Sequence, residues 1–551
     1  MTPRGMKAKA RFAAAGIAAA VAAALLVTVP SAAATAPPME QPKASGANVC
    51  TDTAIPQPIK DKPGSLLAQP QDVTTESGIA TGRLYRVLYT TTGPAGSVQA
   101  SCGLIAVPDG DTIKGVIAWA HGTRGLNVDC QPSTNPAGFV GPMYGGIGSP
   151  TPKGTQQSGA LYGMLTSGSA VVATDYYSQG VGGDDLQMYV LGVAEGLAVI
   201  DSARVLTNNP EAFGLADIAR NAQIPLIPWG HSQGGGSALW AGQIASQYLS
   251  LNDDRTLNLA GVAAIAPATQ FTTSPGQPDS YMGKHLGDRD MYNFDPGLPV
   301  KIPIGAAFFS YVTTSWSQVQ AATEGAMPFG PTRSVDYADI LSKSGAKTAP
   351  KVAALCLTPN DLLKVLVQVE KYLLPDLWRF FDEPFAGSKV NGKWTGGVDA
   401  TCANLKDDPG TVREWCQWLQ FNMPGPNGVN PYAKVPRNNG GNEVPVYIAQ
   451  GRNDRIMWCV DDSGKVNDGN CLSAQFYQSM ANRYCDGDGA LQADYFADVT
   501  HFTAPGAAAV NPKTLAYSGS PLDEFVDGAL SGSLPRTCSE NTLPNPLPSP
   551  K

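Results

Sequence analysis

The chain has 551 residues, with 38 Lys and Arg against 46 Asp and Glu, and its formal net charge is −8. An acidic chain without basic runs argues against nucleic acid and anionic membranes as partners. Its length exceeds that of one usual domain, so we expect either one large domain with an insertion or two domains.

Residues 1–34 are expected to be a secretory signal peptide. Four basic residues precede an Ala-rich apolar stretch, and the small residues SAAATA follow it. This three-part pattern is typical of a cleaved leader, and the quick change to small residues favours cleavage over a membrane anchor. Removing the leader takes the formal charge from −8 to −12. We therefore expect an exported, soluble product.

All ten cysteines follow the leader. An even number of cysteines in an exported chain favours disulfides over metal ligands, and none of the spacings is that of a zinc site. The stretch from Cys459 to Cys471 is predicted to be a closed surface loop. The pairing of the cysteines stays open.

Short apolar strands alternate with amphipathic helices along most of the chain. Two β-branched runs, 81–92 and 97–108, predict an antiparallel hairpin at the start. The expected later elements are strands at 115–122, 169–177, 224–230, 261–268, 444–451 and 493–500, and helices at 186–206, 232–249 and 473–483. This rhythm predicts an α/β fold with a mostly parallel central sheet flanked by helices on both faces.

Residues 270–440 interrupt that rhythm with apolar, helix-like segments. We interpret them as a helical cap inserted between late strands, with a separate accessory domain as the alternative. Aromatic residues here could line an acyl pocket, but we favour a role in the cap core; they are Phe308, Phe309, Trp316, Trp378, Phe380 and Phe381. The expected organisation is a leader (1–34), a core in two parts (50–269 and 441–535), the cap (270–440) and a loosely ordered Pro-rich tail (536–551).

The sequence Gly230-His231-Ser232-Gln233-Gly234 fits the G-x-S-x-G pattern. In a nucleophile elbow the serine lies on a tight strand-to-helix turn, where side chains two residues away on either side would collide. The pattern stands between the apolar run 224–229 and a predicted helix. We therefore predict that Ser232 is a nucleophile and that Gly230 and Gly234 make room for the turn.

A serine nucleophile needs a base, and the chain has only four histidines. His231 adjoins the serine on the tight turn and should point away, His121 belongs to a strand-end loop, and His285 lies in the proposed cap. His501 remains, directly after the last predicted strand. We predict that it is the general base and acid.

The histidine in turn needs a carboxylate that orients it. Asp454 follows the predicted strand 444–451, at the carboxyl edge of the sheet. Asp498, three residues before His501, is the rival, whereas Asp461 and Asp462 fit a solvated loop. We favour Asp454, and the order Ser, Asp, His along the chain is that of α/β-hydrolases.

A tetrahedral intermediate requires backbone N–H donors. Gln233 supplies one at the start of the predicted helix. The second is expected from the loop after strand 115–122, with Thr123 as first choice and Gly122 as the alternative. An ordinary turn in that loop is the competing interpretation.

The motifs GHSQGG, ATDYYSQG, GVAAIAPAT and YIAQGRNDRI resemble those of the secretory lipase family. The resemblance spans about residues 80–530 and implies an α/β-hydrolase fold, carboxylic ester hydrolysis and a cap over the acyl site. It also implies the triad roles of Ser232, Asp454 and His501 and the donor role of the Gln233 N–H. The loop HGT, residues 121–123, is closer to that of other esterases, and the cap diverges most.

These observations predict a secreted serine ester hydrolase that works through an acyl-enzyme, with a small-molecule or lipid ester as its substrate. No metal or other cofactor is expected, and contact with a lipid interface would be transient and through the cap. The alternatives are an acyltransferase with the same triad, a prolyl-type peptidase and a noncatalytic binding protein on this fold. Acyl length and oligomeric state stay open.

Overall fold

The computed structural model describes residues 48–55, 58–138, 140, 159–177, 181, 186–216, 223–272, 304–319, 327–357, 359–376, 388–390, 393–395, 411–426, 430–457, 459, 471–485 and 489–547. The predicted leader, His285, Trp378, Phe380, Phe381, Asp461 and Asp462 lie outside these residues.

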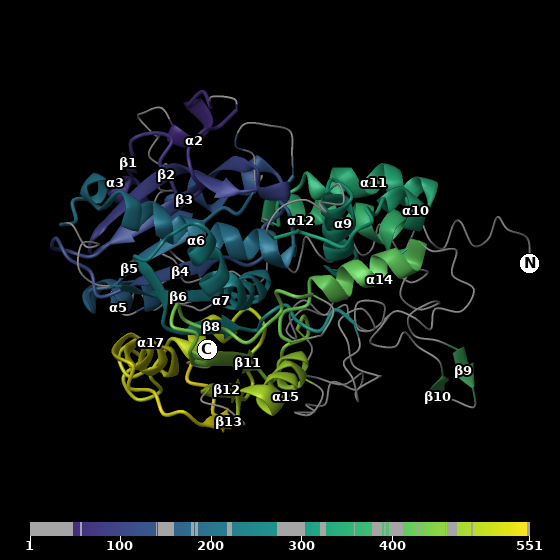
Figure 1. Cartoon of the computed structure of the whole chain (residues 1–551). Coiled ribbons are helices and arrows are strands. Elements are labelled where there is room, and N and C mark those ends of the chain that lie inside the picture. The colour runs from purple at the N-terminus through teal and green to yellow at the C-terminus, as the bar shows by residue number, and fades with distance from the viewer. Residues whose placement is uncertain are drawn as a thin grey trace, which may run out of the picture.

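The centre of the fold is one sheet with the strand order β1-β2-β3-β5-β4-β6-β8-β11-β12-β13, and β7 pairs with β6 (Figure 1). The strands are β1 (Gln71–Asp72), β2 (Arg83–Thr92), β3 (Val98–Val107), β4 (Val116–Ala120), β5 (Ala170–Thr174), β6 (Ile224–His231), β7 (Leu257–Leu259), β8 (Val262–Ile265), β11 (Val446–Gly451), β12 (Leu491–Phe496) and β13 (Cys538–Leu543). A separate pair is formed by β9 (Ser388–Val390) and β10 (Lys393–Thr395).

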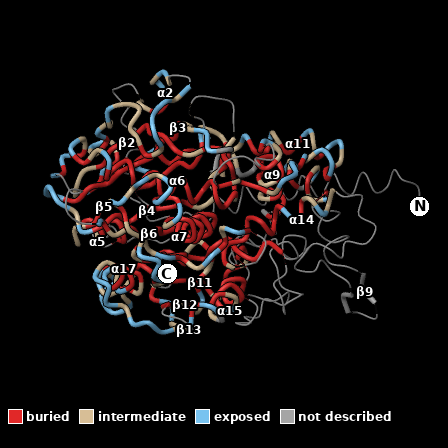
Figure 2. Tube along the Cα trace, viewed as in Figure 1, coloured by how far each residue is buried: buried red, intermediate tan, exposed pale blue. Residues whose placement is uncertain are grey.

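The sheet is mixed at one edge and parallel elsewhere. The predicted hairpin forms between β2 and β3, with Arg83 opposite Val107. From β5 to β13 all neighbouring strands are parallel. Every residue of β4, β5, β8 and β11 is buried, as expected for parallel strands covered on both faces (Figure 2). The expected fold class, a mostly parallel α/β sheet with helices, is therefore confirmed.

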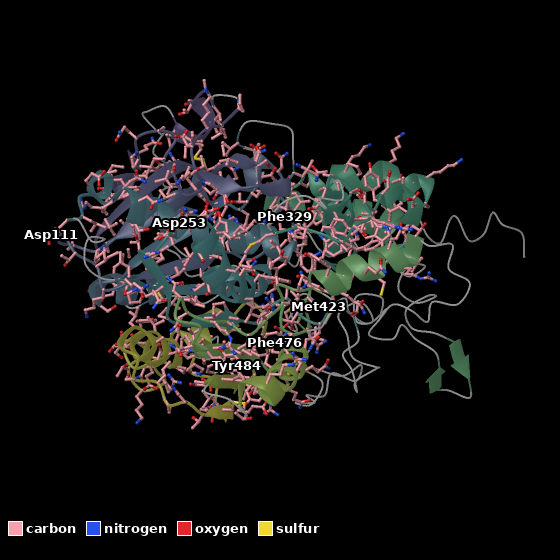
Figure 3. All side chains as sticks on the ribbon, viewed as in Figure 1. Asp111, Asp253, Phe329, Met423, Phe476 and Tyr484 are labelled. Atoms are coloured by element: carbon pink, nitrogen blue, oxygen red, sulfur yellow. A yellow bond between two sulfur atoms is a disulfide. The ribbon has the colours of Figure 1, made fainter. Side chains whose placement is uncertain are left out.

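The helices that accompany the sheet are α2 (Val49–Asp52), α3 (Thr74–Ser77), α5 (Ala160–Thr166), α6 (Gly192–Asn208), α7 (Gln233–Leu251), α15 (Leu472–Tyr484), α16 (Ala504–Ala508) and α17 (Pro521–Ser531). The long helices α6 and α7 pack against each other and against the strands at the middle of the sheet. Helix α15 packs on β12, and its Phe476 and Tyr484 are buried (Figure 3). Each described helix is too short or too polar to cross a bilayer.

The insertion between β8 and β11 contributes helices that lie together beside the sheet (Figure 1). They are α9 (Ile304–Trp316), α10 (Tyr337–Ile340), α11 (Lys343–Ala353), α12 (Pro359–Gln368), a π-helical turn (Val369–Leu373) and α14 (Thr411–Phe421). Their core contains the ring of Trp316 stacked on Trp415 at 6.1 Å and tilted against Trp418 at 5.7 Å, and all three side chains are buried.

Two sequence expectations are wrong in detail. The helix expected over 186–206 begins only at Gly192, because Val190 has φ 55° and its N–H bonds the side chain of Glu195 rather than a helical carbonyl. The tail expected to be loosely ordered contains β13, which extends the sheet beside β12 and is fastened to the end of α15 by the disulfide Cys485–Cys538.

Four disulfides connect described residues: Cys50–Cys102, Cys130–Cys356, Cys459–Cys471 and Cys485–Cys538. The pair Cys459–Cys471 closes the loop predicted from the sequence. Cys130–Cys356 joins a loop of the sheet domain to the insertion after α11. Multiple disulfides fit a protein of an oxidising compartment.

We predict that the double variant Cys485→Ser/Cys538→Ser is less stable by about 4 kcal/mol. The disulfide closes a long loop, and a cross-link lowers the conformational entropy of the unfolded chain more when the loop is longer. Denaturant unfolding of the variant and the oxidised wild type measures the difference. An unchanged unfolding midpoint would show that strand pairing alone holds β13 on the sheet.

Candidate active site

The register of the sheet brings the predicted site residues to one edge. Gly230 in β6 pairs with Ala120 in β4 and with Ala264 in β8. On the other side of β8, β11 and β12 run parallel to it. Because the carboxyl ends of parallel strands meet at the same edge, the loops that follow β4, β6, β11 and β12 converge there.

Ser232 lies between β6 and α7 with φ 60° and ψ −121°. This conformation is unfavourable for a residue with a side chain, and it persists only where the surroundings fix it. The Ser232 N–H donates to the carbonyl of Ile265 at 2.9 Å, and its carbonyl accepts from the N–H of Ala268 at 2.9 Å and of Gly236 at 3.2 Å. The backbone of the serine is therefore fixed from both sides, as in a nucleophile elbow.

The flanking glycines are required by backbone contacts. A Cβ atom on Gly230 would lie 2.1 Å from the carbonyl oxygen of Gly234, and a Cβ on Gly234 would lie 1.9 Å from the carbonyl oxygen of Ala120. Backbone atoms of a central strand cannot move aside as a flexible side chain would. The close approach of β4, β6 and α7 thus depends on the absence of side chains at both positions.

Asp454 and His501 meet at this edge. Asp454 follows β11, His501 follows β12, and both are buried. The distance between Asp454 Oδ2 and His501 Nδ1 is 2.8 Å. The rival Asp498 is exposed and adopts φ 53° beyond the end of β12. Of the two candidate carboxylates, the structure brings Asp454 to the histidine.

The Asp454 carboxylate is oriented by its own loop. Its Oδ1 accepts the N–H groups of Ile456 and Met457, both at 2.8 Å, and the side-chain amide of Gln450 donates to Oδ2 at 2.5 Å. The Ser473 hydroxyl in turn donates to the Gln450 carbonyl oxygen. These bonds aim Oδ2 at the imidazole.

The ring of His231 also contributes to the position of His501, a role that sequence reasoning did not assign. Its Nε2 lies 2.9 Å from the His501 carbonyl oxygen, and the two ring centroids are 4.7 Å apart. Burial, and then the nearby charge of His501, lower the pKa of His231 well below its ordinary value. A neutral ring that donates from Nε2 fits this contact.

Ser232 and His501, both described, form no hydrogen bond with each other in this structure. Catalytic hydrogen bonds are often long or open without substrate and tighten when it binds. The contact of His501 with His231, the residue before the serine, keeps the imidazole beside the elbow.

The candidate oxyanion donors lie next to the serine. Gln233 is the first residue of α7, and the first N–H groups of a helix have no partner within it. A Cβ on Gly122 would lie 3.5 Å from the Ser232 Cβ, and Thr123 lines the same pocket as Ser232. The hydroxyl of Tyr176 donates to the carbonyl of His121 at 2.7 Å and fixes the start of this loop.

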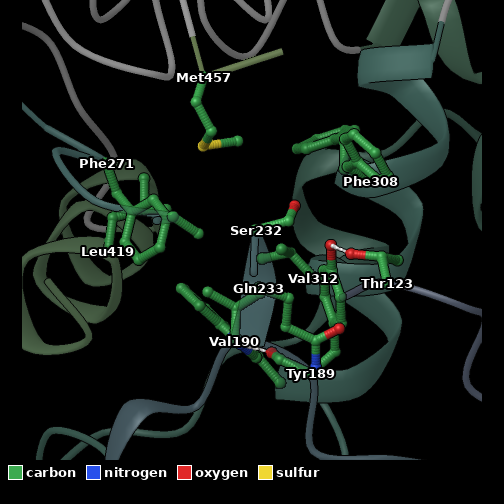
Figure 4. Close-up of a pocket in the computed structure, with 13 residues that line it drawn as sticks. Thr123, Tyr189, Val190, Ser232, Gln233, Phe271, Phe308, Val312, Leu419 and Met457 are labelled. Carbon is green, nitrogen blue, oxygen red and sulfur yellow. Dashed lines mark hydrogen bonds between the residues drawn. The ribbon is translucent and has the colours of Figure 1, made fainter. Parts of the chain in front are cut away.

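A pocket lined mostly by apolar side chains opens over Ser232, whose hydroxyl is turned into it (Figure 4). The insertion supplies much of its wall through α9 and α14. The lining residues are Thr123, Tyr189, Val190, Ser232, Gln233, Ala268, Phe271, Phe308, Phe309, Val312, Trp316, Leu419 and Met457. Trp316 and Phe309 are therefore both core residues of the insertion and pocket wall.

Behind the pocket, Glu195 of α6 is a buried carboxylate surrounded by neutral donors. Its Oε1 accepts from the Val190 N–H at 2.8 Å and the Gln233 side-chain amide at 2.6 Å, and its Oε2 accepts from the Ser237 hydroxyl at 2.6 Å. No described Lys, Arg or His pairs with it. Burial raises the pKa of Glu195 from 4.5 to about 7.

Glu195 was not singled out from the sequence, although one signal was available: it is an acidic residue in the first turn of an otherwise apolar helix segment. As for metals, the described part of the chain contains no group of three or more His, Cys, Asp or Glu side chains placed to hold an ion.

Comparison with known proteins gives one family match. Residues 154–279 match the model of the family described as secretory lipase. The matched segment includes Ser232 but neither Asp454 nor His501. No curated protein sequence matches the chain.

The fold is similar to that of Candida antarctica lipase A. The closed-state structure of that protein has a TM-score of 0.52 at 16% identity, and the match covers 86% of this chain and 83% of the lipase. A second structure of the same lipase gives a TM-score of 0.51 at 15% identity, with coverage of 87% and 86%. At such identities the likeness is one of fold.

We predict that Gly234→Ala is destabilised by at least about 2 kcal/mol, because the new methyl group overlaps backbone atoms that cannot yield. Gly440→Ala is the matched control, since that glycine is exposed and its added Cβ would meet only side-chain atoms at 3.3 Å. Thermal unfolding compares the two. Equal midpoints would refute the close approach of β4 and α7.

The titration of Glu195 predicts a pH dependence of stability. The unfolded carboxyl titrates near 4.5 and the folded one near 7, so the folded state binds more protons between these values. The stability that the Glu195 carboxyl adds to the folded state is therefore complete below pH 4.5 and is lost as pH rises through about 7. The facing titratable groups, Tyr176 and Tyr189, have raised pKa values and stay neutral in this range.

Glu195→Gln removes this titration. The stability of the wild type relative to the variant should therefore fall by up to about 3 kcal/mol between pH 4 and pH 8. Urea unfolding at several pH values measures both proteins. If the free energy of unfolding depends on pH in the same way in both proteins, the pKa of Glu195 is not raised.

Proposed function

We propose that the chain is a carboxylic ester hydrolase with Ser232 as its nucleophile. The match to the secretory lipase family and the likeness of fold to a lipase support this assignment. One arrangement carries the proposal: a serine in a constrained elbow at an apolar pocket, beside the 2.8 Å pair of Asp454 and His501. A structural serine needs none of these features, whereas together they match the parts of a Ser-His-Asp site for acyl transfer.

In the proposed reaction His501 Nε2 removes the proton from Ser232 Oγ as this oxygen attacks the ester carbonyl carbon. Asp454, bonded to Nδ1, stabilises the imidazolium that forms. The N–H groups of Gln233 and of Thr123 or Gly122 stabilise the oxyanion. The C–O bond to the alcohol then breaks, and the alcohol leaves with the proton from His501.

In the hydrolysis of the acyl-enzyme, water is the nucleophile and Ser232 Oγ is the leaving group. His501 takes a proton from water, the hydroxide attacks the acyl carbon, and the bond to Ser232 Oγ breaks as His501 returns the proton to that oxygen. Each proton that is removed is given back, and every group in the proposed cycle is a side chain or backbone N–H of this chain.

The apolar lining of the pocket favours an apolar acyl group, since each buried methylene contributes about 0.8 kcal/mol. The insertion residues Phe308, Val312 and Leu419 form part of this wall. We infer that the insertion is a cap over the acyl site, and that transient contact with a lipid interface would occur through it. The predicted leader and the disulfides support an exported enzyme.

We predict that Ser232→Ala loses at least about 10⁴-fold in kcat on p-nitrophenyl esters, because no other group can form the acyl-enzyme. Ser202→Ala is the control: the hydroxyl of this buried serine of α6 donates to the Val199 carbonyl, its one partner among the described residues, and its loss should leave activity unchanged. Undiminished hydrolysis by Ser232→Ala would refute the proposal.

The carboxylate assignment has its own matched pair. Asp454→Asn should lower kcat by about 10³- to 10⁴-fold, because the amide cannot stabilise the imidazolium. Asp498→Asn should change little, since that side chain is exposed and asparagine tolerates its positive φ. The opposite ranking would assign the acid to Asp498.

Two experiments distinguish the proposed hydrolase from an acyltransferase and from a noncatalytic binding protein. Incubation of an ester with a second alcohol yields mainly free acid if water is the acceptor, and mainly a new ester if the alcohol is preferred. A fluorophosphonate that labels Ser232 excludes a purely noncatalytic role.

A further inference from the structure

The segment Gln187–Leu191 touches three parts of the proposed site at once. It leads from the sheet domain into α6, lies beside α9 of the cap, and contributes Tyr189 and Val190 to the pocket wall (Figure 4). We propose that this segment couples the cap to the oxyanion hole. Tyr189 is then the positioning residue for Thr123, and Glu195 is the positioning residue for Gln233. The inference rests on the proposed ester hydrolysis at Ser232.

The link to the cap consists of three hydrogen bonds. The Tyr189 N–H donates to the Ser315 hydroxyl at 2.8 Å, and that hydroxyl donates to the Gln187 carbonyl at 2.8 Å. The indole N–H of Trp316 donates to the Tyr189 carbonyl at 2.8 Å. All four side chains are buried, so a displacement of the C-terminal end of α9 must displace Tyr189 or leave these groups unpaired.

The link to the first oxyanion loop is the hydroxyl of Tyr189, which lies 2.8 Å from Thr123 Oγ1. The Tyr189 ring also packs edge-on against Tyr311 of α9 at 5.7 Å. The side chain that contacts the cap helix is therefore also the one that fixes the orientation of Thr123.

The link to the second oxyanion residue is Glu195. A single oxygen, Oε1, accepts both the Val190 N–H and the Gln233 side-chain amide. Val190 needs such fixation, because φ 55° is an outlier for a β-branched residue. The pocket wall and the first residue of α7 are thus fastened to one atom.

Protonation of Glu195 leaves this link intact. The acid can donate from Oε2 to the Ser237 hydroxyl, which has its own acceptor in the Gln233 carbonyl at 3.0 Å. Oε1 still accepts from Val190 and Gln233. Glutamine at position 195 offers the same acceptor and the same donor, so the tie requires an acceptor and not a charge.

The functional consequence concerns acyl length. An acyl chain that fills the pocket lies between Val190 on one side and Phe308 and Val312 of α9 on the other. It presses on the segment that positions Thr123 and Gln233, so a filled pocket aligns the oxyanion donors. An acetyl group has a single methyl carbon beyond its carbonyl and therefore fills less of the pocket and presses less on this wall.

The test measures kcat and KM of Glu195→Met, Glu195→Gln and Tyr189→Phe on p-nitrophenyl acetate and p-nitrophenyl octanoate. Methionine matches the size of the glutamate but removes the acceptor. For Glu195→Met and Tyr189→Phe we expect kcat on the octanoyl ester to fall about tenfold, within the range known for small misplacements of a reacting group, and kcat on the acetyl ester less than about threefold. Glu195→Gln should stay within about twofold of wild type on both esters.

The matched control for the tyrosine is Tyr311→Phe, whose hydroxyl bonds the Leu355 carbonyl at 3.3 Å and is not part of the pocket lining. It should behave as wild type. Equal losses on the two esters, or an effect of Glu195→Gln as large as that of Glu195→Met, would overturn the coupling and leave a merely structural role. Tyr189→Phe keeps the test decisive if Glu195→Met does not fold.

These outcomes are separable from failure of the proposed function itself. If Ser232→Ala retains full activity, the hydrolase assignment fails whatever the position-189 and position-195 variants do. If Ser232→Ala is inactive and the losses are independent of acyl length, the hydrolase assignment stands and only the coupling fails.

Discussion

The positive φ of Ser232 is the constraint on which the rest of the site depends. The serine can adopt it because its N–H and carbonyl are bonded to the loop around β8 on one side, and because Gly230 and Gly234 admit the backbone of β4 on the other. The order β4-β6-β8 at the centre of the sheet is therefore part of the proposed chemistry. Any strand order that separated β4 or β8 from β6 would leave the hydroxyl without its support.

The two buried carboxyl groups near the pocket, Asp454 and Glu195, accept hydrogen bonds from different kinds of donor. Asp454 receives N–H groups from its own loop and faces an imidazole that can carry positive charge. Glu195 receives only neutral donors, and burial raises its pKa toward neutrality. The first arrangement suits a group that orients the imidazole in the proposed reaction, and the second suits a group whose hydrogen bonds, rather than its charge, hold the neighbouring backbone in place.

The insertion is fastened to the same loops that form the proposed oxyanion hole. The disulfide Cys130–Cys356 and the bond from the Leu357 N–H to the Arg124 carbonyl at 2.7 Å fix the end of α11 beside the loop that contains Gly122 and Thr123. The end of α9 is bonded to Tyr189. The pocket wall and the sheet edge that carries Ser232 thus form one packed unit, and the proposed coupling of acyl length to catalysis rests on this packing.

The sequence by itself determined the local features: the alternation of strands and helices, the elbow around Ser232, and the choice of Asp454 and His501 from their places after two strands. These depend on periodicity, turn chemistry and strand direction, all of which are local. It did not reveal that the tail contributes β13, or that His231, Tyr189 and Glu195 bond residues of the proposed site. Those outcomes were decided by the tertiary structure. Each depends on a hydrogen bond or a strand pairing between residues that are far apart in the sequence, and local sequence patterns do not predict such contacts.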